Sequence, residues 1–123
     1  EILIQHAKSK EPYESCAILI GEENEQGWKV IEVFLTENIE KSKINFTISP
    51  QEEFKIDEIA KQKNLEIVSI FHSHPTSEPT PSITDKKFMR VNPFPWIIYS
   101  GITNTMKAYS IDLELNDISI DVV

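Results

Sequence analysis

The sequence predicts a single domain of the α/β or α+β class, in which helices cover a central sheet. Short apolar runs rich in Val, Ile and Phe alternate along the chain with segments that carry helix start signals. The chain has 123 residues, of which 40% are hydrophobic and 26% charged, as is typical of one soluble globular domain. Because strands and helices are mixed, we expect one domain over residues 1–123, with helices packed on a sheet.

Three segments carry the signals of helices. Residues 1–8 have apolar side chains at a spacing that suits a short helix. In Ser49-Pro50-Gln51-Glu52 the serine is an N-cap, the proline takes the first helical position and an acid follows three residues after the serine. We expect this helix to run to about residue 63. A third helix start follows a loop rich in Pro, Ser and Thr, and this helix is expected to run to about residue 91.

The remaining apolar segments read as strands of the sheet. They are short, rich in β-branched and aromatic residues, and bounded by turn residues. The expected strands are 16–20, 28–36, 46–48, 66–71, 95–100, 106–113 and 118–123. Gly21 is expected to close the first of them, and the strand at 46–48 is short.

Charge and composition narrow the classes of function. Twelve basic residues against twenty acidic ones give a net charge of −8, which argues against a nucleic-acid binder because phosphate contacts need clustered Lys and Arg. No apolar run approaches the roughly 20 residues that span a bilayer, so we expect no membrane span. The single cysteine, Cys16, excludes a disulfide framework and a Cys-rich zinc site within one chain. A reducing, cytoplasmic setting is therefore expected.

Two histidines and an aspartate form the most informative pattern. His72 and His74 lie at the mouth of a predicted strand, and side chains at i and i+2 of a strand leave on the same face. Asp85 comes eleven residues after His74, in the first turn of a predicted helix, and the intervening loop is long enough to bring it to the same point. Two imidazoles and a carboxylate suit Zn²⁺, and three protein ligands leave the fourth tetrahedral position open, as in catalytic sites.

Each candidate residue also has an ordinary structural interpretation. Histidine pairs at strand ends also occur as surface residues or as satisfied core groups. Ser82 and Asp85 could form a helix capping pair, which does not exclude a metal-binding role for the aspartate. Glu14 lies directly before the apolar strand 16–20, where an acid is usually a solvated residue at the edge of the strand.

Taken together, these segments resemble the signature of the JAMM (MPN+) zinc metalloprotease family. The signature consists of His72-Ser73-His74-Pro75, six further residues, Ser82, two residues and Asp85. The upstream segment Pro12-Tyr13-Glu14-Ser15-Cys16 resembles the one that carries the family's catalytic glutamate. The resemblance covers nearly the whole chain. It implies a compact prokaryotic or archaeal-type member related to the proteasomal and AMSH-type deubiquitinases.

The resemblance also implies a fold and a set of residue roles. The fold would be a single MPN domain of the α/β class, cytidine-deaminase-like, with a central mixed sheet flanked by helices. His72, His74 and Asp85 would bind one zinc ion with its catalytic water. Glu14 would act as general base and then as acid toward the leaving amine, and Ser82 would help to stabilise the oxyanion.

The activity implied is zinc-dependent hydrolysis of the isopeptide or peptide bond after the C-terminal tail of ubiquitin or a ubiquitin-like modifier. The partners would be that modifier and its conjugates. One alternative is a peptidase that processes the C-terminus of a ubiquitin-like sulfur-carrier protein. Two further candidates are a RadC-like protein, which the net charge disfavours, and a non-catalytic interaction module. Zinc deaminase chemistry is disfavoured because the Pro-Cys-x-x-Cys ligands are missing.

Overall fold

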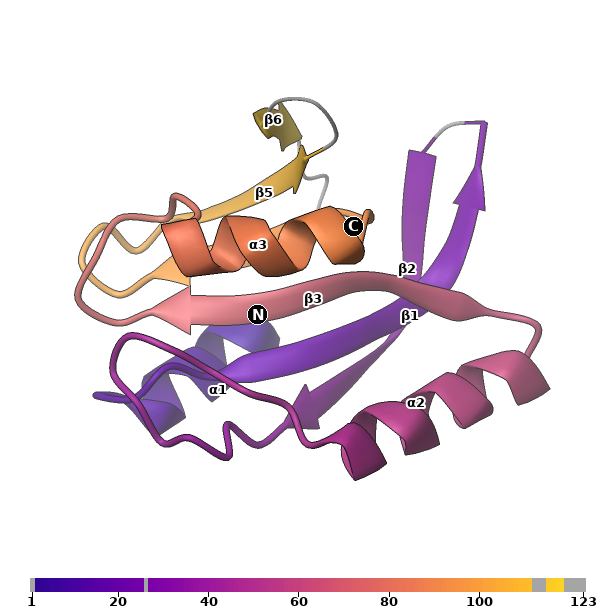
Figure 1. Ribbon diagram of the computed structural model, residues 1–123, viewed down its shortest axis with the longest axis horizontal. Helices are drawn as coiled ribbons and strands as arrows, with labels where there is room; N and C mark the ends of the chain where they lie inside the picture. The colour runs from indigo at the N-terminus through magenta and orange to yellow at the C-terminus, as the bar shows by residue number, and fades with distance from the viewer. Residues whose placement is uncertain (1, 26, 112–114, 119–123) are drawn as a thin grey trace.

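The fold is a mixed sheet with helices on both faces, as the sequence predicts. The computed structural model describes residues 2–25, 27–111 and 115–118. In this part of the chain, six strands lie in the order β2-β1-β3-β4-β5-β6 (Figure 1). The strands are β1 (Cys16–Asn24), β2 (Gly27–Thr36), β3 (Glu66–His74), β4 (Trp96–Ser100), β5 (Met106–Ile111) and β6 (Leu115–Ile118). β3 and β4 are parallel, and every other neighbouring pair is antiparallel.

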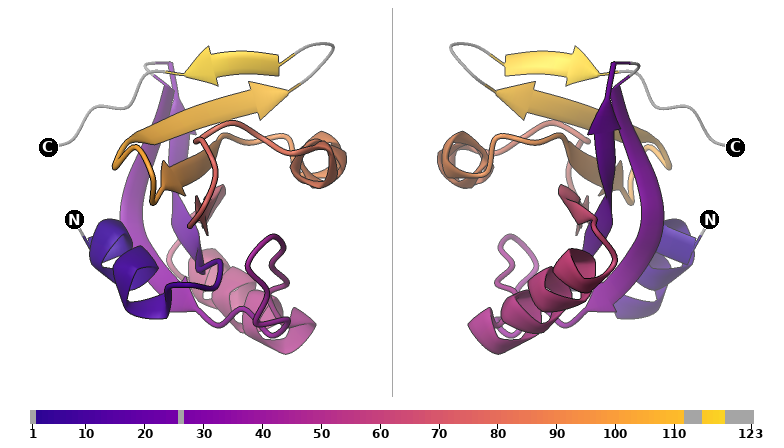
Figure 2. Two further views of the ribbon diagram at one scale, coloured as in Figure 1. Left: turned by 90° about the vertical axis from the view of Figure 1, so that its left-hand side faces the viewer. Right: turned by 90° about the vertical axis from the view of Figure 1, so that its right-hand side faces the viewer.

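The helices cover the two faces of the sheet unequally. They are α1 (Ile2–Lys10), α2 (Pro50–Gln62) and α3 (Ile83–Val91). Figure 2 shows α1 on one face of the sheet and both α2 and α3 on the other. None of the helices in the described ranges is long and apolar enough to cross a membrane.

Successive side chains of the central strands point to opposite faces of the sheet, so the hydrophobic core has one part on each face. Ala17 and Leu19 of β1 pack with α1, whereas Ile18 and Ile20 pack with α2. Further along the sheet, Ile70 of β3 packs in the cluster that includes Met89 of α3. Because His72 and His74 share the parity of Ile70, they leave β3 on the face that α2 and α3 cover.

The predicted helices and most of the strands are confirmed. The N-cap at the start of α2 forms as expected, with the Ser49 hydroxyl oxygen accepting a hydrogen bond from the Glu52 backbone nitrogen at 3.1 Å. At the C-terminal end of the chain, residues 112–114 and 119–123 lie outside the described residues. The predicted strand 106–113 therefore corresponds to β5 as far as Ile111, and of the predicted strand 118–123 only Ile118, which ends β6, is described.

The prediction that Gly21 closes the first strand is wrong, because β1 continues to Asn24. The register of β1 shifts between Ile20 and Gly21, and there the backbone of Lys29 comes very close. A Cβ atom at position 21 would lie 1.8 Å from the Lys29 carbonyl oxygen. The glycine thus permits a β-bulge inside the strand instead of ending it.

The short strand predicted at 46–48 is also wrong, because these residues belong to the loop between β2 and α2. The loop folds back on itself. The backbone nitrogen of Thr47 donates to the side-chain oxygen of Asn38, and the carbonyl of Thr47 accepts from the backbone nitrogen of Ile39. These bonds use the backbone groups that would otherwise pair with a neighbouring strand.

Candidate metal centre

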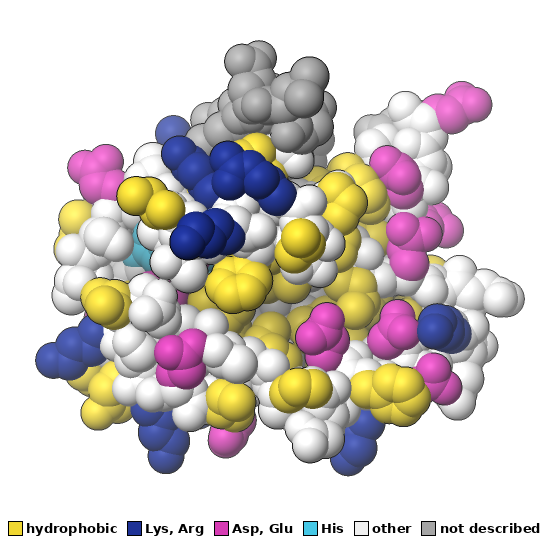
Figure 3. Space-filling view, viewed as in Figure 1, with side chains coloured by type: hydrophobic (Ala, Val, Ile, Leu, Met, Phe, Trp, Pro, Cys, Tyr) yellow, Lys and Arg dark blue, Asp and Glu magenta, His cyan; other side chains and the backbone are white. Residues whose placement is uncertain are grey.

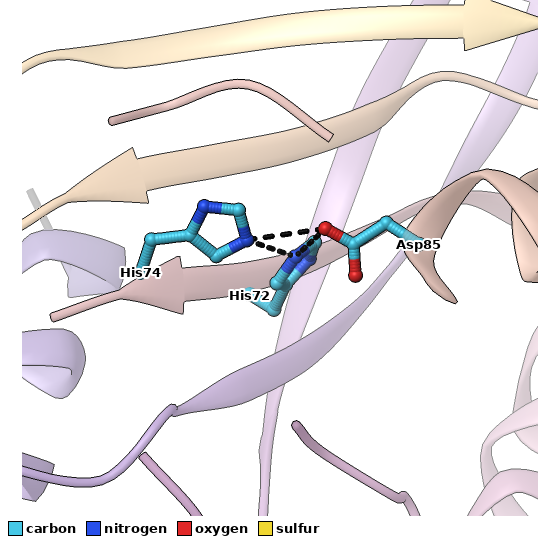
Figure 4. Close-up of side chains that lie close together, drawn as sticks. All are labelled: His72, His74 and Asp85. Carbon is cyan, nitrogen blue, oxygen red and sulfur yellow. Dashed lines mark hydrogen bonds and ion pairs between the residues drawn. The ribbon is translucent and has the colours of Figure 1, made fainter. Parts of the chain in front are cut away.

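Three predicted ligand residues meet at the end of β3. The Nε2 atoms of His72 and His74 lie 3.1 Å apart, and each is 3.0–3.1 Å from Oδ2 of Asp85 (Figure 4). The histidines leave neighbouring positions of one strand face, and the aspartate reaches them from the first turn of α3. All three are buried, with exposed fractions of 0%, 5% and 6%. Accordingly, little histidine surface is visible at the left end of α3 in Figure 3.

The start of α3 holds Asp85 in place. The Asp85 backbone nitrogen donates to the Ser82 hydroxyl oxygen, and the Ser82 backbone nitrogen donates to Oδ2 of Asp85, each at 3.0 Å. This is a complete capping box, so the interpretation of the pair as a helix cap is correct. It does not compete with a ligand role, since the same carboxylate oxygen faces both histidines.

The protonation of His74 follows from its second nitrogen. Nδ1 of His74 lies 2.9 Å from the backbone carbonyl oxygen of Glu78. Since a carbonyl can only accept, Nδ1 carries the hydrogen, and in the neutral ring the lone pair on Nε2 points at Asp85. This lone pair and the carboxylate oxygen lie 3.1 Å apart and repel each other. A proton on Nε2 or a metal ion bound to both atoms would relieve the repulsion.

The three ligand atoms fit a metal ion in spacing and in chemistry. A tetrahedral zinc site with bonds of about 2.0–2.1 Å places neighbouring ligand atoms roughly 3.3 Å apart, close to the separations seen here. His72, His74 and Asp85 each offer one ligand atom, and all three ligand atoms lie within 4.8 Å of one another. The pairing of imidazole nitrogen with carboxylate oxygen suits Zn²⁺.

The surroundings set the protonation state of each predicted ligand, and those of His72 and Asp85 are the states that metal binding requires. Burial lowers the pKa of His72, which keeps its ring neutral. Burial alone would raise the pKa of Asp85, but its contacts with His72 and His74 hold it well below the usual range. Burial opposes protonation of His74, whereas its bonds to Asp85 and the Glu78 carbonyl raise its pKa. His74 is thus the predicted ligand whose surroundings favour a proton, and that proton would have to leave when a metal binds.

Glu14 is buried, so its interpretation as a solvated residue at the strand edge is wrong. Only 4% of the residue is exposed, and its Oε1 has no hydrogen-bond partner among the described residues. Burial raises its pKa to about 8, with the positive charge of His74 lowering it and the negative charges of Asp85 and Glu40 raising it. The carboxyl group thus lies within electrostatic reach of the predicted ligands and has a lone pair that no neighbour uses.

A cavity of about 320 Å³ lies against the same glutamate. Its walls include Glu14, Thr36 at the end of β2, and Asn38 and Lys41 of the following loop. The cavity thus provides space next to the buried carboxyl group of Glu14, whose Oε1 accepts no hydrogen bond from the described residues.

Phe46 belongs to the centre, although its sequence neighbourhood carries no signal of this role. Its ring stacks on the imidazole of His72, with centroids 4.7 Å apart and planes inclined by 22°. The two residues are 26 positions apart, in a loop and a strand that the sequence alone does not bring together. The composition of residues 46–48 favours a strand, and only the folded chain shows the contact of Phe46 with the histidine.

Comparison with known proteins places these features in a family. The sequence model for prokaryotic homologues of the JAB domain matches residues 1–112. A desampylase from Pyrococcus furiosus is 39% identical over 90 residues, which make up 73% of this chain and 61% of the desampylase. The match thus spans less than two thirds of the length of that relative.

Solved structures share the fold at lower identity. A solution structure from Desulfitobacterium hafniense is 22% identical, with a TM-score of 0.85 over 98% of this chain and 85% of the other. A solution structure from Salinibacter ruber is also 22% identical, with a TM-score of 0.70 over 97% and 83%. A crystal structure of a JAB1/MPN domain protein from Archaeoglobus fulgidus is 19% identical, with a TM-score of 0.63 over 99% and 88%. The chain therefore belongs to the prokaryotic homologues of the JAB domain, within the JAMM family whose signature its sequence resembles.

Proposed function

We propose that this protein is a zinc-dependent isopeptidase that cleaves the bond after the C-terminal tail of a ubiquitin-like modifier. The observation that carries the proposal is the convergence of His72, His74 and Asp85 at separations of 3.0–3.1 Å. A buried glutamate, Glu14, lies within electrostatic reach, and its Oε1 has no hydrogen-bond partner in the described part of the chain. The similarity to desampylase supports conjugates of a ubiquitin-like protein as the substrate class. Family membership supports the hydrolase reaction.

His72, His74 and Asp85 hold the ion in this mechanism. Their nitrogen and oxygen atoms approach from one strand face and one helix start, so both elements must keep their positions for the site to exist. Bound zinc supplies Lewis acidity, which activates water and polarises a carbonyl group at neutral pH.

Glu14 moves the proton. Its carboxylate accepts a proton from the attacking water and delivers it to the nitrogen of the departing amine. In the metal-free protein burial raises the pKa of Glu14 to about 8, and the positive charge of a bound metal ion would lower it toward the range of a general base. The unpartnered Oε1 leaves an acceptor available without breaking an existing hydrogen bond.

Ser82 stabilises the oxyanion of the tetrahedral intermediate. In the capping box its hydroxyl oxygen accepts from the Asp85 backbone nitrogen, and that bond does not use the hydroxyl hydrogen. The hydrogen is therefore available to the oxyanion while the oxygen still caps α3. Because the Ser82 backbone also donates to Oδ2 of Asp85, the serine is held close to a metal ligand.

The test uses two substrates that share one modifier. The first carries the modifier joined to a lysine side chain, and the second carries a short peptide extension at the modifier's C-terminus. Intact mass is measured after incubation with the protein alone, with chelator, and with chelator followed by zinc. The proposal predicts zinc-restored cleavage of the isopeptide substrate. Faster cleavage of the peptide extension would favour C-terminal processing of a sulfur carrier. Zinc binding without cleavage of either substrate would contradict the proposal and favour a non-catalytic module.

A further inference from the structure

The imidazole of His72 lacks the support that metal-binding histidines usually have. Such a ring almost always donates its second nitrogen to a carboxylate, a carbonyl or water, and this bond fixes its orientation. Nδ1 of His72 is buried and has no hydrogen-bond partner among the described residues, whereas Nδ1 of His74 bonds to the Glu78 carbonyl. Among the described residues, the contacts that hold the His72 ring on this side are therefore packing contacts.

Two aromatic rings take that place. Phe46 stacks on the imidazole at a centroid distance of 4.7 Å. Trp96 of β4 meets the same imidazole edge-on, with centroids 6.0 Å apart and planes at 82°. Phe46 and Trp96 also contact each other, at 6.1 Å and 60°. The rings of Phe46 and Trp96 therefore restrict both tilt and rotation of the His72 ring.

The loop that carries Phe46 is itself held firmly. The side chain of Asn38 makes four hydrogen bonds, donating to the carbonyls of Glu14 and Asn45 and accepting from the backbone nitrogens of Glu40 and Thr47. All the hydrogen-bonding capacity of this amide is thereby used.

The same loop is also tied to the candidate general base. The backbone nitrogen of Glu14 donates to the carbonyl of Ser42 at 2.8 Å, in addition to the bond from Asn38 to the Glu14 carbonyl. The loop thus connects the backbone of Glu14 with the ring of His72.

We infer that Phe46 is a positioning residue that orients His72 toward the metal, at a ring whose Nδ1 has no hydrogen bond to any described residue. The inference rests on the metal centre of the proposed function and adds a determinant of zinc affinity that lies outside the motif. The Phe46 side chain offers no metal ligand and would act through its contact with the imidazole. Loss of the partner that orients a metal-binding histidine typically weakens metal binding about 10–100-fold.

The experiment measures zinc affinity in three variants by competition with a chromogenic chelator. Phe46→Leu removes the stacked ring, and Phe46→Tyr keeps it. Phe54→Leu is the matched control, because Phe54 is a phenylalanine of α2 that is 64% exposed. We expect the zinc dissociation constant to rise about 10-fold or more in Phe46→Leu and to stay within about 2-fold of the wild type in the other two. Cobalt substitution adds a second readout, since the visible spectrum of Co²⁺ reports ligand geometry. That spectrum should change in Phe46→Leu alone.

Circular dichroism of the metal-free proteins shows whether each variant folds. If Phe46→Leu does not fold, Phe46→Met takes its place, because it keeps apolar volume without a ring. Wild-type affinity and an unchanged cobalt spectrum in a folded variant without the ring would overturn the inference while leaving the proposed function intact. Failure of the wild type to bind zinc would overturn both.

Discussion

The Oγ atom of Ser73 accepts hydrogen bonds from both the backbone nitrogen and the hydroxyl of Ser15, at 2.8 Å and 2.9 Å. The Ser73 backbone nitrogen returns a third bond to the Ser15 carbonyl at 3.0 Å. Ser15 follows Glu14, and Ser73 stands between His72 and His74. These three bonds therefore fix the start of β1, with the candidate general base, against the end of β3, with two candidate ligands.

Replacing Ser73 with alanine should destabilise the protein without removing the ligands. The variant leaves a buried backbone N–H and a buried hydroxyl without an acceptor, which costs about 1–3 kcal/mol of unfolding free energy. Urea unfolding measures the change, and Thr76→Ala is the control because Thr76 is exposed in the next loop. An unfolding free energy of Ser73→Ala equal to that of the wild type would show that these bonds do not hold the two strands together.

The Glu14→Gln variant should bind zinc and lose hydrolysis. The amide keeps the size of the side chain but cannot accept and return a proton, and such a loss typically lowers the rate by about 10²–10⁴-fold. Zinc content by elemental analysis and cleavage of the isopeptide substrate by mass are measured on the same sample. Full activity in a zinc-loaded variant would remove Glu14 from the mechanism.

The same substitution should change how the stability of the metal-free protein depends on pH. Glu14 has a pKa of about 8 in the folded protein, against an ordinary value of 4.5. Between these values the folded state holds a proton that the unfolded state has released, so stability falls as pH rises. The contribution is about 1.4 kcal/mol for each pH unit within that window.

Urea unfolding of the wild type and of Glu14→Gln, both with chelator, from pH 5 to pH 7.5 isolates this contribution. Titrating groups that do not interact with Glu14 affect both proteins equally, so the difference between their unfolding free energies reports Glu14 together with its charge interaction with His74. The variant should gain stability relative to the wild type as pH rises. A difference that stays constant over this range would mean that the carboxyl group titrates at an ordinary pKa.

The two roles of Ser82 can be separated by choosing the replacement. Asparagine is a good N-cap but has no hydroxyl, whereas threonine keeps both properties. Ser82→Asn should therefore retain stability and lose roughly 10²–10³-fold in turnover, as expected for removal of one oxyanion donor. Ser82→Thr should stay close to the wild type in both. Equal turnover in Ser82→Asn and the wild type would leave the serine with its capping role alone.

The sequence predicts the convergence of His72, His74 and Asp85 well because the signals for it are local. Alternation in one strand places His72 and His74 on one face, and the capping signal places Asp85 in the first turn of a helix. The burial of Glu14 could not be inferred in this way, because it depends on a loop and on strands that are distant in sequence. For that residue the family resemblance, and not its own neighbourhood, predicts a catalytic role, and the Glu14→Gln variant tests it.

The errors in the fold have the same origin. Gly21 has the composition of a turn residue, yet the close approach of the Lys29 backbone makes it a bulge within β1. The segment 46–48 has the composition of a strand, yet hydrogen bonds to Asn38 and Ile39 hold it in a loop. In both cases a tertiary contact overrides a local preference.

Anomalous diffraction at the zinc absorption edge, from a crystal soaked in zinc, tests the central claim most directly. We predict one strong peak within bonding distance of Nε2 of His72, Nε2 of His74 and Oδ2 of Asp85, and its loss in Asp85→Ala. Asp57→Ala, which removes a partly exposed carboxylate of α2 that pairs with Lys61, should keep the peak. If the wild-type crystal shows zinc only at other residues, or shows the three side chains turned away from one another, the proposed metallopeptidase centre is contradicted.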